Sequence, residues 1–222
     1  MVDVPVVAVR GEAVLEVAPE IARFTVTVSA RDKDRQATLT RLTQRVDAIR
    51  RVLDGYGEAI ERRETGSVQV YPELKRSGER ISAYVASLAT TVTVTDFTVL
   101  GELMLRLGDE DQTSVAGPWW TLRPNSPVHR QARRAAVDDA VSRAGEYAEA
   151  VGCQVGRLLE LSDTGMSSAP TPRIAFAAGM QTMRSGAPMP ELDLEPQQQT
   201  VVGNVEMRFT LVRPAGFADG AE

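Results

Sequence analysis

The chain has 222 residues, of which 43% are hydrophobic and 25% charged, and this composition is ordinary for a soluble globular protein. Its net charge of −5 argues against nucleic-acid binding, because phosphate contacts need a clustered basic surface. The single cysteine, Cys153, excludes an intramolecular disulfide and any metal cluster built on cysteines.

No hydrophobic run approaches the roughly 20 residues that span a bilayer, so we predict no transmembrane segment. The first residues, Met1–Pro5, lack the basic and apolar regions of an export signal. The sequence as given therefore predicts a cytoplasmic protein. The alternative is a periplasmic or envelope-associated protein whose leader has been removed.

The first part of the chain predicts a strand, a helix and two further strands. Alternation of apolar and polar residues over Ala22–Ala30 indicates a half-buried antiparallel strand. Asp34–Leu53 carries apolar residues at spacings of three and four, which indicates a helix with one apolar face. Ser67–Leu74 and Ile81–Thr95 follow as a hairpin, because Ser77-Gly78-Glu79 between them is a turn sequence.

The same order is predicted a second time. Its strand, long helix and two strands are Thr113–Leu122, Pro127–Val151, Val155–Ser162 and Val201–Val212. A short helix, Phe97–Leu107, precedes them. We therefore predict an α+β fold of two related β-α-β-β units, in which antiparallel sheet is packed by two long helices. The predicted domain covers 1–212, with halves of about 6–97 and 113–212, and 213–222 is a flexible tail.

The second long helix has an unusual apolar stripe, which consists mostly of small residues. Small side chains let a helix approach a sheet closely, so packing explains this stripe without a ligand. The first turns of the helix carry Arg130, Arg133 and Arg134, but Asp138 and Asp139 follow at once. This pattern favours a solvated helix face over a phosphate-binding site.

Two regions are candidate contact surfaces. Trp119 and Trp120 are adjacent in a predicted strand, so they face opposite ways and one of them can face solvent or a partner. Coverage of both by the chain itself is the competing interpretation. The segment 166–200 is rich in proline and methionine, and is either a surface for subunit contacts or disordered. Its candidate interface residues are Met180, Met183 and Met189.

The sequence contains no recognisable catalytic set. A Ser-His-Asp hydrolase would depend on the single histidine, His129, and no Gly-x-Ser-x-Gly elbow is present. Glycine-rich nucleotide-binding loops are absent too, and one histidine with one cysteine is too few for a zinc site of those ligands. A carboxylate pair could be selected only by geometry. We therefore predict no catalytic, cofactor-binding or metal-binding residue, although enzymatic activity stays an open question.

Motifs along the chain resemble the SIMPL-domain family of bacterial proteins. The matching segments are Val9–Ala13, Ala18–Glu20, Ile81–Tyr84, Ala148–Gly156 and Val205–Leu211. In this order they span nearly the whole chain. The sequence departs from the family pattern at Glu20, where aspartate is usual, at Ala83, where glycine is common, and at Gln197 or Gln198, where Gly-Glu is usual.

The resemblance implies no agreed enzymatic activity and no catalytic residue to carry over. It also implies that some relatives are linked to stress tolerance, some are surface antigens, some assemble into ring-like homo-oligomers, and many are exported. We therefore predict a non-enzymatic structural or interaction module that self-associates as a homo-oligomer and needs no cofactor. The alternative is a small-molecule or lipid-binding protein with an unknown ligand, held in a groove between the helices and the 166–200 loop.

Overall fold

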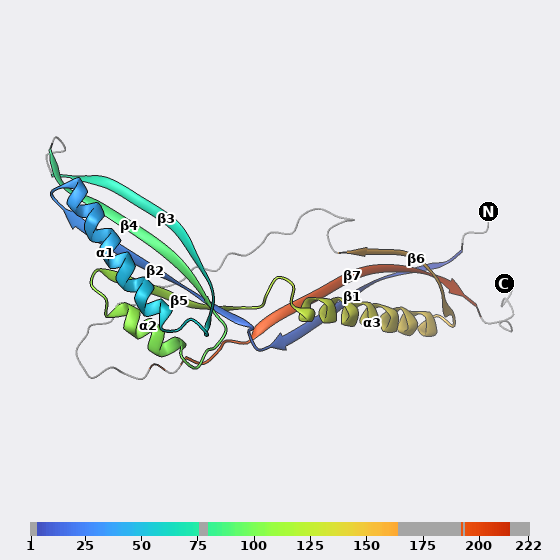
Figure 1. The fold of residues 1–222 in the computed structure, drawn as a ribbon. Coiled ribbons are helices and arrows are strands. Elements are labelled where there is room, and N and C mark those ends of the chain that lie inside the picture. The colour runs from blue at the N-terminus through green and yellow to red at the C-terminus, as the bar shows by residue number, and fades with distance from the viewer. Residues whose placement is uncertain (1–3, 76–79, 164–191, 193, 214–222) are drawn as a thin grey trace. The chain divides into compact units, whose positions relative to one another are not determined.

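The structure is a computed structural model that describes residues 4–75, 80–163, 192 and 194–213 (Figure 1). These residues form seven strands and three helices. They divide into two compact units, which are described separately below. The larger unit takes its described residues from 18–123 and 192–198, and the smaller unit from 4–17, 124–163 and 199–213.

The larger unit is an antiparallel sheet with helices on one face. Its elements are β2 (Ile21–Asp32), α1 (Arg35–Asp54), β3 (Ile60–Leu74), β4 (Ile81–Val94), α2 (Leu100–Gly108) and β5 (Thr113–Thr121). The strand order is β3-β4-β2-β5, and all neighbouring strands run antiparallel. The strands β3 and β5 are therefore the two edges of this sheet.

Alternation along β2 decides which face of this sheet is buried. Phe24, Val26 and Val28 are almost completely buried, whereas Thr25 and Thr27 between them are half-buried on the other face. The two helices complete this core with Leu42, Val46, Ile49, Leu53, Leu100, Leu103 and Leu107. A shift of β2 by one residue would bring its threonines into the core, so burial fixes the strand register.

The smaller unit is a three-stranded antiparallel sheet with one helix. Its elements are β1 (Val6–Val17), α3 (Pro127–Ala150), β6 (Gln154–Asp163) and β7 (Gln199–Val212). The strand order is β1-β7-β6, so β7 is central. Val9, Val205, Met207 and Phe209 form the core together with alanines of α3. The described part of this unit has no second helix to cover the other face of the sheet.

The helix α3 lies very close to its sheet, because small residues meet on both sides. Its buried stripe is Ala132, Ala136, Ala140, Ala144 and Ala148. A Cβ atom placed on Gly11 of β1 would lie 1.9 Å from the backbone oxygen of Ala136. A Cβ atom on Gly203 of β7 would lie 2.2 Å from the backbone oxygen of Ala132. The alanine stripe therefore has the packing role that the sequence indicates, and glycine is required on the strands beneath it.

The predicted α+β fold class is confirmed. The strand predicted over Thr113–Leu122 is present as β5 and belongs to the sheet of the larger unit. β5 pairs with β2 in the larger unit, and β1 lies beside β7 in the smaller unit. The short connection Asp109–Gln112 after α2 accounts for the pairing of β5, because it returns the chain to the sheet that α2 covers.

The two units share one topology when α2 and β5 are set aside. Each has the order strand, helix, strand, strand, and the last strand lies in the centre of the three. The first strand is β2 in the larger unit and β1 in the smaller one, so the smaller unit takes its first strand from before the larger unit. The internal repeat and the predicted halves of about 6–97 and 113–212 stay predictions.

We expect Gly11→Ala to lower the free energy of unfolding by about 1–3 kcal/mol, because the added methyl group collides with the α3 backbone. Gly145→Ala is the matched control, since a Cβ atom at this position in α3 meets no atom within 4 Å. That control should stabilise the protein by roughly 0.5–1 kcal/mol, as glycine weakens a helix interior. Urea unfolding followed by circular dichroism measures both. Equal stability of the two variants would contradict the close approach.

Candidate functional site

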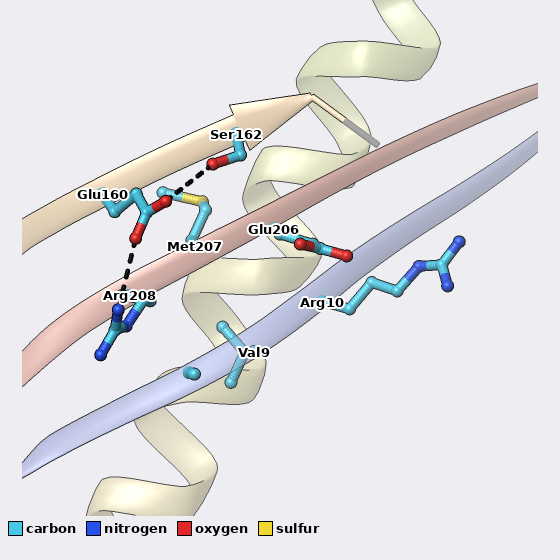
Figure 2. Close-up of a pocket in the computed structure, with 8 residues that line it drawn as sticks. Val9, Arg10, Glu160, Ser162, Glu206, Met207 and Arg208 are labelled. Atoms are coloured by element: carbon cyan, nitrogen blue, oxygen red, sulfur yellow. Dashed lines mark hydrogen bonds and ion pairs between the residues drawn. The ribbon is translucent and has the colours of Figure 1, made fainter. Parts of the chain in front are cut away.

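A hollow of about 420 Å³ lies over the three strands of the smaller unit (Figure 2). It is lined by Ala8, Val9, Arg10, Glu160, Ser162, Glu206, Met207 and Arg208. In the β1-β7-β6 register, Arg10 is opposite Glu206, and Glu206 is opposite Ser162. Arg208 is likewise opposite Glu160, so the polar side chains form two rows across the sheet. The helix α3 lies behind the strands in this view.

Opposite charges are neighbours in this hollow. Nη1 of Arg208 lies 3.4 Å from Oε2 of Glu160, and the Ser162 hydroxyl donates to Oε1 of Glu160 at 3.2 Å. Nε of Arg10 lies 3.2 Å from Oε1 of Glu12. About half of each ion-paired side chain is exposed. Because these side chains are paired and about half exposed, the hollow suits polar contacts with a partner better than proton transfer.

The edge strand β1 is held by a carboxylate from α3. Oδ2 of Asp139 accepts hydrogen bonds from the backbone N–H of Glu12, at 2.9 Å, and from Nη2 of Arg143, at 2.8 Å. The Glu12 N–H, with the Arg143 guanidinium, lowers the pKa of Asp139 below its usual value. This contact, which we call the Asp139 clamp, occupies an edge donor that a further strand could otherwise use.

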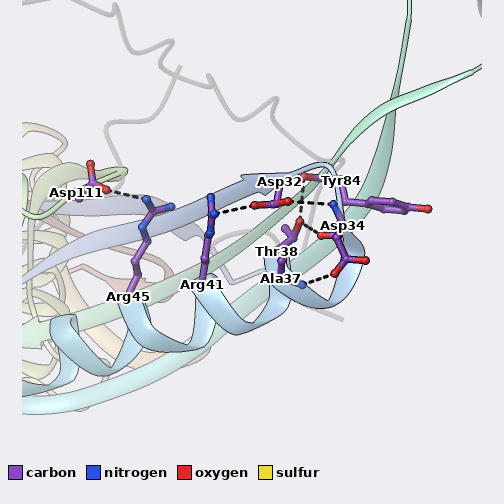
Figure 3. A network of polar contacts seen from close by, with 8 residues as sticks. All are labelled: Asp32, Asp34, Ala37, Thr38, Arg41, Arg45, Tyr84 and Asp111. Atoms are coloured by element: carbon purple, nitrogen blue, oxygen red, sulfur yellow. Dashed lines mark hydrogen bonds and ion pairs between the residues drawn. The ribbon is translucent and has the colours of Figure 1, made fainter.

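In the larger unit, polar contacts stabilise the N-terminal end of α1 (Figure 3). Oδ1 of Asp34 accepts from the backbone N–H of Ala37 at 2.8 Å and caps the helix. Asp32 accepts from the backbone N–H of Asp34 at 3.0 Å and pairs with Arg41 at 2.9 Å. The Asp34 N–H, assisted by Arg41, lowers the pKa of the Asp32 carboxyl.

One turn further along α1, Arg45 joins the helix to the sheet and to the loop before β5 (Figure 3). Its guanidinium donates to the carbonyl oxygen of Ser29 and to Oδ2 of Asp111, both at 2.7 Å. Every carboxylate drawn in this network therefore faces an N–H donor. These contacts explain how α1 is positioned over the sheet.

The tryptophans have different surroundings. Trp119 on β5 is 52% exposed. Trp120 packs against the core of the larger unit, and its ring meets Phe97 edge-on at 4.8 Å. The other predicted interface residues, Met180, Met183 and Met189, lie outside the described residues. Whether Trp119 and Trp120 form an interface stays a prediction.

A second hollow, of about 210 Å³, lies in the larger unit beside α1. Its lining combines apolar side chains of α1, β2 and β4 with polar ones, and consists of Val28, Val46, Ile49, Arg50, Leu53, Asp54, Arg63, Thr65, Leu88 and Thr90. Its volume is below the roughly 300–1,000 Å³ of common small-molecule sites. Most of the 166–200 loop lies outside the described residues, so the predicted ligand groove between the helices and this loop stays a prediction.

The part of the chain that the structure describes lacks clear metal-binding and membrane-spanning features. It holds no group of three or more His, Cys, Asp or Glu side chains arranged to bind a metal ion. It also holds no helix that is both long and apolar enough to cross a membrane. His129 and Cys153 are half-buried, and the length of α3 separates them, because His129 lies in its first turn and Cys153 follows its last residue, Ala150.

Comparison with known proteins decides the family. The model of the SIMPL family, described as a protein of unknown function (DUF541), matches residues 7–209. The chain belongs to the SIMPL family. The 26 kDa periplasmic immunogenic proteins of Brucella melitensis biotype 1 and Brucella abortus strain S19 are each 30% identical to it over 198 residues. The alignments cover 82% of this chain and 75% of each relative.

The family resemblance seen in the sequence is therefore confirmed. The names of these SIMPL-family relatives place them in the periplasm, which agrees with the alternative prediction of location and does not support the cytoplasmic one. The sequence did not indicate the Asp139 clamp, because its partners are 127 residues apart. The only local signal is Arg143 four residues after Asp139, which is common on helix surfaces.

We expect Asp139→Ala to lower the urea midpoint at pH 7, because the Glu12 N–H and Arg143 lose their acceptor. Asp138→Ala is the matched control on the same helix, and Asp138 is an exposed residue. Since folding lowers the pKa of Asp139, its contribution is complete above the unfolded pKa of about 3.9 and is lost as the pH falls through the folded pKa. The difference between the two variants should therefore shrink in acid. Identical midpoints at pH 7 would exclude a stabilising clamp.

Proposed function

We propose that this SIMPL-family chain is a non-enzymatic interaction module that self-associates in the cell envelope. The observation that carries the proposal is Trp119, which exposes 52% of its surface on the edge strand β5. An exposed indole on an edge strand is favourable for association, because it offers a large apolar contact on a strand that can pair with another chain.

The contrast between the two tryptophans supports this choice of contact residue. Trp120 is directly opposite Ala22 and packs into the core, so its burial is explained by the fold. Trp119 is opposite Arg23 on the other face, and Arg23 is exposed as well. Packing within the larger unit therefore explains the burial of Trp120 but does not explain a large apolar side chain at position 119. Contact with a partner explains the exposed Trp119.

The envelope location is inferred from the relatives. Both Brucella proteins are named periplasmic, and each is similar to this chain over most of its length. Antibody detection of the native protein in fractionated cells of its source tests this inference. Recovery in the periplasmic fraction, together with a periplasmic marker enzyme, is expected, and recovery with a cytoplasmic marker would contradict it.

We expect Trp119→Ala to lower the solution mass at a given concentration, since removal of a central interface tryptophan weakens association by about 2 kcal/mol or more. Size-exclusion chromatography with light scattering measures this mass over a range of concentrations. Tyr147→Ala is the matched control, because Tyr147 is 57% exposed on α3 in the other unit. A wild-type protein that is monomeric at every concentration would refute self-association. An unchanged oligomer in Trp119→Ala would remove Trp119 from the interface.

A further inference from the structure

Three arginines lie on the first turns of α3. Arg130, Arg133 and Arg134 are exposed, and none forms an ion pair within the described residues. Elsewhere in the described chain, ion pairing of arginine is common. The paired residues are Arg10, Arg31, Arg41, Arg45, Arg50, Arg62, Arg63, Arg106, Arg123, Arg143 and Arg208. Other described arginines, such as Arg23 and Arg157, also form no ion pair, but the group on α3 places three of them within five residues of one helix. We call this group the arginine patch.

The two aspartates that follow do not neutralise the arginine patch. Asp139 is half-buried, and its Oδ2 already accepts from Glu12 and Arg143. Asp138 borders the arginine patch as one exposed carboxylate and forms no ion pair within the described residues. The first turn of α3 contains no acidic residue. The arginine patch thus keeps a net positive charge in a chain whose total charge is −5.

Two hollows adjoin the arginine patch and share Arg130 and Arg133. One has a volume of about 580 Å³ and is also lined by Arg134, Val137 and Asp138. The other has a volume of about 430 Å³ and is also lined by Pro124, Asn125, Ser126 and His129. The Ser126 side chain accepts from the backbone N–H of Val128 at 3.3 Å, so the helix end is capped within the chain. Guanidinium groups are therefore the main donors around both hollows.

We propose that Arg130, Arg133 and Arg134 bind phosphate groups. A guanidinium donates paired N–H groups in a plane that matches two oxygens of one phosphate, which is why arginine is favoured at such sites. Several arginines around shared hollows match a ligand with neighbouring phosphates or a surface that presents many of them. Such phosphates occur on lipid headgroups and in soluble compounds, and the experiment below separates these two sources. This proposal is independent of self-association through Trp119.

The test compares the wild-type chain with a triple variant, Arg130→Gln, Arg133→Gln and Arg134→Gln. Its control is Arg31→Gln, Arg50→Gln and Arg62→Gln, which removes three ion-paired arginines from the other unit. Both variants have the same net charge, which falls from −5 to −8. Binding is measured by sedimentation with phosphatidylglycerol vesicles, with phosphatidylcholine vesicles for comparison, and by titration calorimetry with inorganic pyrophosphate. Circular dichroism confirms that each variant is folded.

We expect the wild type and the control to bind phosphatidylglycerol vesicles more strongly than phosphatidylcholine vesicles, and salt to weaken this binding. The patch variant should lose roughly fivefold in partitioning for each arginine removed. Binding of pyrophosphate alone, lost in the same variant, would identify a soluble phosphate compound as the source. The proposal is overturned if neither probe binds the wild type at low salt, or if the patch variant and the control bind equally.

Discussion

The contact between the α3 backbone and the glycines beneath it sets the geometry of the smaller unit. Gly11 and Gly203 leave room for the backbone oxygens of Ala136 and Ala132, so the helix packs closer than it could above side chains. This close packing brings Asp139, on the next turn, within hydrogen-bond distance of the Glu12 N–H. The position of one carboxylate at the sheet edge therefore depends on glycines at two strand positions.

The two sheets have the same open character, although they are stabilised in different ways. Helical packing is described on one face of each sheet, by α3 in the smaller unit and by α1 and α2 in the larger, and each sheet has two edge strands, among them β1 and β5. The Asp139 clamp occupies a backbone donor on β1, whereas β5 exposes Trp119. A clamped edge resists addition of another strand, and an edge with an exposed indole favours association. This difference is the physical basis for placing the proposed interface on β5.

Much of the fold can be predicted from local patterns in the sequence. The rest depends on contacts between residues that are far apart in the sequence, which local patterns do not reveal. Alternation in β2 and the apolar stripe of α1 are properties of neighbouring residues, so both elements were predicted close to their observed bounds. The pairing of β5 depends on which sheet the chain meets after α2, and local alternation is the same for either choice. For Trp119 and Trp120, the sequence shows that they face opposite ways, but only packing against Phe97 identifies Trp120 as the buried one.

The adjacent residues Asp138 and Asp139 illustrate how a structural contact changes the charge available for binding. In the sequence both follow the arginines of α3, and together they indicate a balanced, solvated helix face. In the fold, helical geometry turns neighbouring residues by about 100°, so only Asp139 reaches the edge of the sheet. Its carboxylate then accepts hydrogen bonds from the Glu12 N–H and from Arg143. Protection of the β1 edge therefore leaves Arg130, Arg133 and Arg134 with one neighbouring carboxylate in place of two, and this excess of positive charge is what a phosphate ligand needs.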